Sequence, residues 1–385
     1  MTRDRPDWLT QPKTQAVCAA LTQDGAQALF VGGCVRNWLL GVPVRDIDIA
    51  TDATPDRVIA LARAAGLRSV PTGIDHGTVT VVSGGIPHEV TTFRRDIETD
   101  GRHAVVTFST DVAEDAARRD FTMNAIYATP AGELLDPLHG LPDLRARCVR
   151  FIGRAEDRIR EDYLRSLRFF RFHAWYGDPH AGMDADALAA IAVNLDGLEC
   201  LSRERIGAEM LKLLGAPDPA PAVAVMRQTG VLRAILPGAD DTALGPLVHM
   251  TDGADPILRL AALGRGFDVT LRLSKAQARR AALLRDAAEQ GNAPVLGFHL
   301  GAKDACAALF LRAALMGQPV NPQDLVAAQH AADQVFPLKA ADLMPGIRGQ
   351  ELGSMLKKLE ADWIASGFAL TRADLLARAT GNKGG

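Results

Sequence analysis

Two aspartates, Asp46 and Asp48, stand two residues apart in a short stretch where acidic and apolar residues alternate. On a β-strand this alternation would place both carboxylates on one face and both neighbouring isoleucines on the other. Two adjacent carboxylates repel each other unless a positive charge lies between them, and a hard divalent cation such as Mg2+ commonly supplies it. The pair therefore predicts a magnesium site formed by Asp46 and Asp48.

A glycine pair, Gly32-Gly33, lies upstream, between an apolar run and an amphipathic segment. Glycines directly before a helix leave backbone N–H groups free to face phosphate oxygens, and the helix N-terminus favours negative charge there. Alone, a glycine pair is most often a turn, and two spaced aspartates are most often a solvated strand end. In the order strand, glycine pair, helix, turn and acidic pair, they indicate chemistry on a nucleotide with bound Mg2+.

The elements that would position these residues change character along the chain of 385 residues. Helical patterns at 1–25 and 54–65 alternate with strand patterns at 26–31, 46–49, 71–82 and 88–93, which predicts an α/β fold for the first 140 residues. From residue 155 onward, alanine- and leucine-rich helical periodicity replaces the strand signals. Loops with Pro or Gly are expected at 215–217, 236–238, 291–292 and 317–319.

Composition limits the setting in which this chemistry could occur. The five cysteines are scattered without the spacing of a zinc site or a disulfide framework, so we expect reduced thiols. No apolar run approaches a membrane span, and the first residues are too polar for a secretory signal. We therefore expect a cytoplasmic monomer without membrane association.

The net charge of −3 is unusual for a protein that binds nucleic acid, because phosphate contacts require Lys or Arg. Nine arginines nevertheless lie between Arg145 and Arg171, against four acidic residues. This local excess of positive charge predicts one RNA-facing patch.

Three motifs resemble those of one family, the class II tRNA nucleotidyltransferases (CCA-adding enzymes) and bacterial poly(A) polymerases. Residues 32–48 resemble its GGxVRDxLLG signature with the following DxD, although Asn37 stands where the family usually has aspartate. Residues 118–125 (RRDFTMNA) match its RRDFTxNA motif without a gap, and residues 161–165 (EDYLR) match EDxxR. The resemblance spans nearly the whole chain.

This resemblance implies an α/β nucleotidyltransferase (polymerase β-like) head followed by an elongated all-α neck, body and tail. We expect a catalytic head at 1–140, a base-recognising neck at 141–205, a body at 206–300 and a tRNA-binding tail at 301–385. Residues 93–111 resemble the flexible loop of the family, and residues 136–144 resemble its hinge.

The resemblance also implies a role for particular residues. Glu89, on an alternating strand, would be a third acid beside Asp46 and Asp48, although an isolated Glu would more often lie at a wet strand end. One Mg2+ would lower the pKa of an RNA 3′-hydroxyl, and a second would hold the triphosphate and the departing pyrophosphate. The residues expected to bind the nucleotide are Gly32, Gly33, Arg36, Arg119, Asp120, Asn124, Glu161, Asp162, Arg165 and Arg168.

Asp162 and Arg165 are expected to read the base, with Glu161 orienting the arginine. A carboxylate accepts the amino hydrogen of cytosine or adenine, and a guanidinium donates to the adjacent ring nitrogen. Guanine and uracil present the opposite pattern, so the same pair would reject them through unpaired polar groups. As a bare pattern, Glu161 and Arg165 would be an ordinary i,i+4 ion pair on a solvated helix.

The function implied is template-independent addition of CCA to tRNA from CTP and ATP. The alternatives are a poly(A) polymerase, a partial CC- or A-adding enzyme, a non-catalytic RNA-binding protein, and a nucleotidyltransferase acting on protein or small-molecule hydroxyls. Residues 71–78 lack the basic GRRF-type segment of the poly(A) polymerases. None of the nine histidines is followed by Asp, so we expect no fused phosphohydrolase activity.

Overall fold

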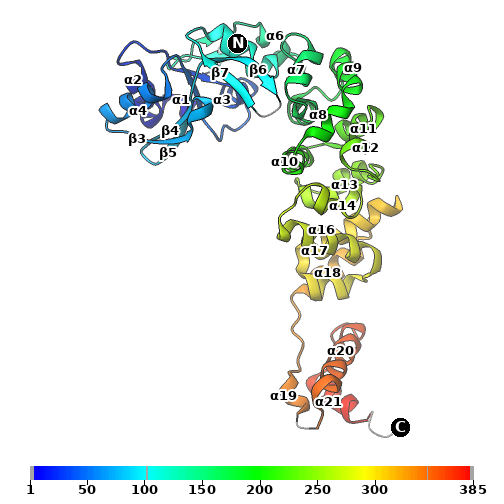
Figure 1. The fold of residues 1–385 in the computed structure, drawn as a ribbon. Coiled ribbons are helices and arrows are strands. Elements are labelled where there is room, and N and C mark those ends of the chain that lie inside the picture. Colours follow the sequence, from blue (N-terminus) through cyan, green and yellow to red (C-terminus); the bar gives the residue numbers. More distant parts are fainter. Residues whose placement is uncertain (1–3, 101–102, 345, 382–385) are drawn as a thin grey trace. The chain divides into compact units, whose positions relative to one another are not determined.

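The computed structural model describes residues 4–100, 103–344 and 346–381, with the side chains of residues 96–106 left out of the description. The chain forms two compact units, Met1–Pro237 and Gly238–Gly385, which are described separately below. Figure 1 shows the strands gathered in the blue and cyan part of the chain and helices following them.

Strands of the first unit form a mixed sheet. Only the pairing of β2 with β5 is parallel among the ladders of the described residues, and every other neighbouring pair is antiparallel. The strand order across the sheet is β3 (Arg68–Gly73), β4 (Thr78–Ser83), β5 (Ile86–Thr92), β2 (Asp48–Thr51), β1 (Leu29–Val31), β8 (Tyr127–Ala128) and β9 (Leu134–Leu135).

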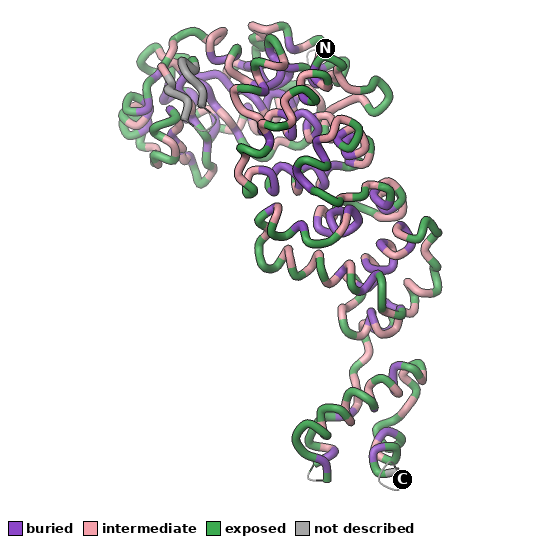
Figure 2. Tube along the Cα trace, turned by 45° about the vertical axis from the view of Figure 1, so that its right-hand side comes forward, coloured by how far each residue is buried: buried purple, intermediate pink, exposed green. Residues whose placement is uncertain are grey.

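The head helices follow the predicted segments closely. The expected N-terminal helix is two helices, α1 (Asp7–Thr10) and α2 (Pro12–Thr22), and the helix expected at 54–65 is α4 (Pro55–Ala64). Both α2 and α4 pack on β4 and β5, where they cover Val79, Val81 and Val90. Figure 2 shows this interior as buried. The other head helices are α3 (Gly33–Leu40), α5 (Val112–Ala117), η1 (Ile74–His76), η2 (Thr122–Asn124) and α6 (Gly140–Arg145).

The segment that resembles the flexible loop contains a two-stranded ladder, β6 (Arg94–Asp100) with β7 (His103–Phe108). Its turn at 101–102 lies outside the described residues. In the segment that resembles the hinge, both carboxylate oxygens of Asp136 accept hydrogen bonds from the first backbone N–H groups of α6. This arrangement satisfies donors that a helix start otherwise leaves exposed.

Helices follow in the rest of the first unit. A single helix through Glu161 and Arg165, which their i,i+4 spacing allowed, is not what forms: α7 ends at Glu161 and α8 begins at Leu164. Asp162 between them has extended backbone, with φ of −155°. The helices are α7 (Ala155–Glu161), α8 (Leu164–Tyr176), α9 (Ala185–Val193), η3 (Leu195–Cys200), α10 (Arg203–Leu214), α11 (Ala220–Gln228) and α12 (Val231–Ile235).

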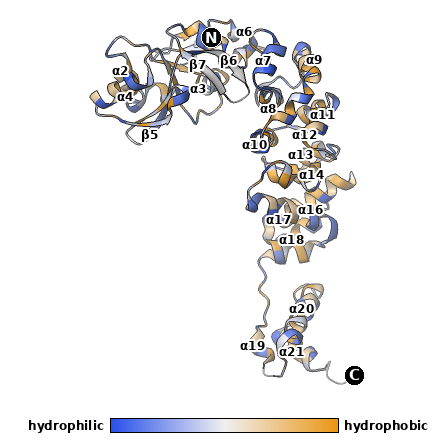
Figure 3. Cartoon of the chain, in the orientation of Figure 1, coloured by the Kyte–Doolittle hydropathy of each residue, from blue (hydrophilic) through white to orange (hydrophobic). Residues whose placement is uncertain are grey.

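The second unit is helical throughout its described residues. Its helices are α13 (Leu244–Met250), α14 (Pro256–Leu263), α15 (Phe267–Thr270), α16 (Lys275–Gln290), α17 (Ala293–Met316), α18 (Pro322–Ala332), α19 (Ala340–Leu343), α20 (Gly349–Ala365) and α21 (Arg372–Gly381). Every residue of α14 from Ile257 onward is buried, and Figure 3 colours this helix mainly as hydrophobic. The helix ends at Leu214, Ile235, Gln290 and Met316 agree with the predicted loops.

Two helices of this unit bear on earlier expectations. By length and composition α17 could cross a membrane, but it is interrupted at Gly301, whose φ is 75° and ψ 165°, and its C-terminal half packs in the core with Ala305, Ala308 and Leu311. In α20, the apolar residues Leu352, Met355 and Leu356 pack with Leu359 and Trp363. Core packing therefore explains the apolar residues of α20 and the buried ones in the C-terminal half of α17.

Candidate active site

The acidic pair lies where the only parallel ladder among the described residues brings two strands together. Asp48 on β2 is opposite Glu89 on β5, and the Glu89 N–H donates to the Ile47 carbonyl at 3.2 Å. Ile47 and Ile49 are 8% and 1% exposed, whereas Asp46 is exposed, so the predicted alternation is present. One detail is corrected: the strand begins at Asp48, and Asp46 precedes it.

These carboxylates carry more negative charge than the protein around them balances. Burial raises the pKa of Asp48 to about 6, the Glu89 and Asp46 charges add to that rise, and Arg119 opposes it. A divalent cation at this point would remove the repulsion, so the donor set fits one. The described residues hold no complete cage of three or more His, Cys, Asp or Glu ligands.

The glycine pair lies beside these acids. Gly32 has φ of 72°, a left-handed conformation that favours glycine, and it precedes α3. A methyl group on Gly32 would lie 3.9 Å from Asp48 Oδ2 and 3.8 Å from Arg119 Nη1. The chain thus brings a side-chain-free backbone turn, a carboxylate and a guanidinium into one place, as a bound triphosphate requires.

Arg36, predicted to bind phosphate, is only 6% exposed. Its guanidinium donates to Asn37 Oδ1 at 3.0 Å, to Tyr176 Oη at 2.9 Å and to the side-chain oxygen of Asn124, and it lies over the Tyr176 ring at 4.0 Å. Asn37 in turn donates to the Pro43 carbonyl at 3.0 Å. An aspartate at position 37 could not make that last bond, because an ionised carboxylate only accepts.

The motif at 118–125 continues the same hydrogen-bond network. Asp120 accepts from Asn124 Nδ2 at 2.8 Å and from Arg168 Nε at 2.7 Å. Burial alone would raise the pKa of Asp120, but the Arg168 charge and the Asn124 hydrogen bond outweigh it and lower that pKa. The network Arg168–Asp120–Asn124–Arg36 therefore joins three motifs that are far apart in the sequence.

Arg119 is held by a residue that the sequence reasoning missed. Asp115, 1% exposed, accepts from Arg119 Nη2 at 2.9 Å, from Tyr127 Oη at 2.7 Å and from Arg118. Although burial opposes it, the charges of Arg119 and Arg118 lower the pKa of Asp115 to about 2. The spacing gave a signal, because Asp115 precedes the two arginines by three and four residues, the distance at which helical side chains meet.

The expected base-reading residues lie at the break between α7 and α8. Arg165 donates to Glu161 Oε2 at 2.5 Å, and also to the backbone carbonyls of Arg158 and Arg118. Asp162 does not pair with Arg165: its Oδ2 accepts from Arg205 at 2.7 Å, and its Oδ1 accepts from the Leu164 N–H at 3.1 Å. Arg205, which is not among the residues expected to bind the nucleotide, thus contacts one of them.

The predicted basic patch is largely neutralised within the protein. Arg145 and Arg147 are exposed. The other seven arginines pair with carboxylates: Arg150 with Asp143 and Asp184, Arg154 with Glu156 and Asp157, Arg158 and Arg165 with Glu161, Arg160 with Glu156, Arg168 with Asp120, and Arg171 with Glu209.

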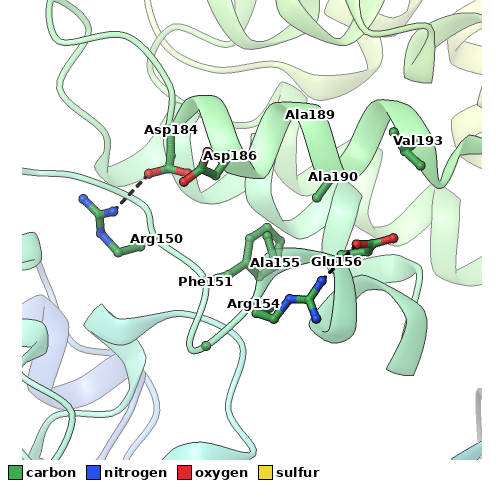
Figure 4. A pocket seen from close by; sticks show the side chains of 11 residues that line it. Arg150, Phe151, Arg154, Ala155, Glu156, Asp184, Asp186, Ala189, Ala190 and Val193 are labelled. Carbon is green, nitrogen blue, oxygen red and sulfur yellow. Dashed lines mark ion pairs between the residues drawn. The ribbon is translucent and has the colours of Figure 1, made fainter.

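Two cavities of the first unit differ in what lines them. One, of about 510 Å³, lies between the segment at 150–156 and α9, and Figure 4 shows the Arg150–Asp184 and Arg154–Glu156 ion pairs at its wall. The other, of about 440 Å³, is lined by Gly33, Asp46 and Asp48 on the head side and by residues of α8 and α10 on the other. The second, which we call the catalytic cleft, contains the acidic pair.

Comparison with known proteins shows the family to which the chain belongs. Residues 28–150 match the model described as "Poly A polymerase head domain", and residues 182–242 match "Probable RNA and SrmB- binding site of polymerase A". The chain is 33% identical to CCA tRNA nucleotidyltransferase 1, mitochondrial, of Mus musculus over 370 residues, covering 90% of this chain and 85% of that one. It is 44% identical to the CCA-adding enzyme of Geobacillus stearothermophilus over 220 residues, or 57% and 52% of the two chains.

A solved structure is similar over its whole length. The crystal structure of the Bacillus stearothermophilus CCA-adding enzyme in complex with CTP matches with a TM-score of 0.80 at 29% identity, covering 98% of this chain and 99% of the other. The α/β head, the helical remainder and the order of the motifs are therefore those of one family. The chain is a nucleotidyltransferase that belongs to the family of CCA-adding enzymes.

Proposed function

We propose that this enzyme adds CCA to the 3′ end of tRNA from CTP and ATP, without a nucleic-acid template, and releases pyrophosphate. The observation that supports the proposal most strongly is the convergence of four separate sequence segments on one point. Asp48, Glu89 and the Gly32 turn lie together, and Arg119 Nη1 faces the same turn. A protein that only binds RNA gains nothing from clustered acids beside phosphate, because like charges repel.

Each of these residues has a proposed task in nucleotidyl transfer. Asp46, Asp48 and Glu89 would hold Mg2+, which when bound would lower the pKa of the RNA 3′-hydroxyl and offset charge on the triphosphate. The backbone N–H groups at Gly32 and Gly33 would donate to phosphate oxygens, and Arg119 would bind the same group. Asp115 holds Arg119 in place, so the guanidinium needs little reorganisation when substrate binds.

We propose that Arg165 and Asp162 select cytosine and adenine. The contacts to Glu161 and to two carbonyls use three of the five N–H donors of Arg165, which leaves donors for a base. Asp162 is anchored by Arg205 through one oxygen and can still accept from an exocyclic amino group. Arg36, Asp120, Asn124 and Arg168 would position these groups through their shared network and line the nucleotide site.

The parts of the chain are proposed to divide the work. Residues 1–140 would carry out catalysis, residues 141–205 would read the base, and residues 206–300 would connect them to a tail at 301–385 that binds tRNA. Lys357 and Lys358 are exposed on α20, opposite its buried stripe, and suit phosphate contact. We place the enzyme in the cytoplasm.

Incorporation of radiolabelled nucleotides tests the proposal. The acceptor is a tRNA transcript that ends at the discriminator base, incubated with Mg2+ and either labelled CTP, labelled ATP or both. We expect two C residues followed by one A, and no incorporation of GTP or UTP. If the protein binds the transcript but incorporates no nucleotide, the result would favour a non-catalytic RNA-binding protein.

A poly(A) polymerase is the second candidate, because the head matches a model of that name. It would extend the same transcript with ATP alone into long tails. Incorporation that stops after two C residues, or that requires a transcript already ending in CC, would instead identify a partial enzyme.

A further inference from the structure

The catalytic cleft extends beyond the acidic pair to residues without an assigned role. Its far wall is formed by the C-terminal end of α8 and by α10, which contribute Arg171, Trp175, Tyr176 and Lys212. The acids lie on the opposite wall, so a molecule in this part of the cleft would present its atoms directly to Asp46 and Asp48.

Trp175 is built as a fixed aromatic surface. Its side chain is 39% exposed although it lines the cleft, and its indole N–H donates to the Lys212 carbonyl at 2.8 Å. That bond ties α8 to α10 and restrains the ring. An exposed aromatic ring held in place is the platform on which proteins stack unpaired nucleobases.

Positive charge borders this platform. Lys212 is 61% exposed at its side chain and lies 3.6 Å from Glu209, which also pairs with Arg171. Glu209 is 5% exposed, so this shared carboxylate is recessed while the lysine reaches solvent. An exposed ammonium group beside an aromatic ring suits one nucleotide, with its base on the ring and its phosphate on the lysine.

The base of the incoming nucleotide is expected at the other end of the same helix. Arg165 and Trp175 are ten residues apart on α8, which corresponds to about 15 Å along the helix axis. Arg165 and Asp162 do not line the catalytic cleft, whereas Trp175 does. The two ends of α8 therefore offer separate sites for two bases, as a transfer between two substrates requires.

We propose that Trp175 stacks on the 3′-terminal base of the RNA acceptor and that Lys212 contacts its phosphate. This places the terminal hydroxyl against Asp46 and Asp48. The inference rests on the proposed function, because it assigns the second substrate of that reaction to a site.

The test is a double-mutant cycle in binding, measured without nucleotide. Wild type, Trp175→Ala and Trp175→Phe are each titrated by filter binding with tRNA ending in CC, and with the same tRNA carrying an abasic terminal nucleotide. We expect the abasic end to weaken wild-type binding on the order of 10-fold to 100-fold. Trp175→Ala should bind the intact tRNA more weakly than wild type by a similar factor, and should bind the abasic tRNA no more weakly than the intact one. Trp175→Phe should keep most of the wild-type affinity.

Lys212→Gln supplies an independent measurement. It should weaken binding and reduce the slope of log affinity against log salt by about one phosphate contact. Lys13→Gln is the matched control, since Lys13 contacts the Gly84 carbonyl outside the cleft.

Two results would overturn the inference. One is that removal of the terminal base weakens tRNA binding to Trp175→Ala as much as it weakens binding to wild type. The other is an increased KM for CTP in Trp175→Ala while tRNA affinity is unchanged, which would place the triphosphate in this part of the cleft. A wild type that binds tRNA through Trp175 but adds no nucleotide would contradict the proposed function alone.

Discussion

The first unit contains two groups of acids that the protein treats in opposite ways. At the junction of β2 and β5, Asp48 faces Glu89 and Asp46, and the pKa of Asp48 rises to about 6, mainly through burial. Asp115 on α5 and Asp120 in the motif that follows it, by contrast, each pair with arginine, and their pKa values fall. Burial raises the pKa of Asp48, Asp115 and Asp120 alike, so their charged partners and not burial explain the difference.

The difference separates chemistry from positioning. Acids whose mutual repulsion is not fully balanced by the protein's own charges are suited to bind an external cation. The bound cation lowers the free energy most where that repulsion is largest. Acids already paired with arginine hold those arginines in fixed directions, which preorganises a binding site. The following predictions test that division, beginning with the largest expected effect.

Replacing Asp48 by Asn should lower incorporation by about 10³-fold, because one carboxylate of the cation site is lost. The melting temperature of the metal-free variant should not fall, since the change removes repulsion with Glu89. Incorporation and thermal unfolding are measured with and without Mg2+. Asp56→Asn, an exposed acid on α4, is the control. A destabilised variant with substantial activity would contradict the assignment of Asp48 to chemistry.

Replacing Arg165 by Ala should reduce discrimination between correct and incorrect nucleotides on the order of 100-fold. The variant lacks the guanidinium that Glu161 positions, so the ring nitrogen of cytosine or adenine loses its hydrogen-bond donor. Ratios of kcat/KM for CTP, ATP, GTP and UTP measure the effect. If selection of C and A were unchanged in the folded variant, base reading would have to lie elsewhere.

Asp115 should contribute to stability in a defined pH range. Its folded pKa of about 2 lies below its ordinary value of 3.8. The stabilisation is therefore complete above about pH 4 and is lost as the pH falls towards 2, amounting to about 2 kcal/mol. Urea unfolding of wild type and Asp115→Asn at pH 7, 4 and 2.5 should show the two midpoints converging on acidification. Midpoints that stay equally far apart at every pH would exclude the Asp115–arginine charge pairing as the cause.

Replacing Arg205 by Gln should raise the KM for CTP about 10-fold, because Asp162 loses the charged partner that anchors it. Arg205→Lys should restore part of the loss, since a lysine keeps the charge without the fork geometry. Glu204→Gln is a neighbouring control on the same helix. An unchanged KM in Arg205→Gln would show that Asp162 holds its position without this ion pair.

Much of the site could be predicted from local pattern. The alternation at 46–49 and at 88–90 depends only on the two-residue period of a strand, and the burial of Ile47, Ile49 and Val90 confirms it. The break between α7 and α8 could not be predicted in this way. The run from 161 to 171 is compatible with a helix locally, and Asp162 leaves that conformation where it meets Arg205, forty-three residues away.

From the sequence by itself one could predict most elements of the head and the acids proposed to carry the chemistry, because these depend on residue type and short spacing. Only the tertiary structure decided which charges meet. Pairings such as Arg168 with Asp120, Arg171 with Glu209 and Arg205 with Asp162 span 38 to 48 residues. A salt bridge acts over a few ångströms, so its existence depends on how the helices pack and not on any local pattern.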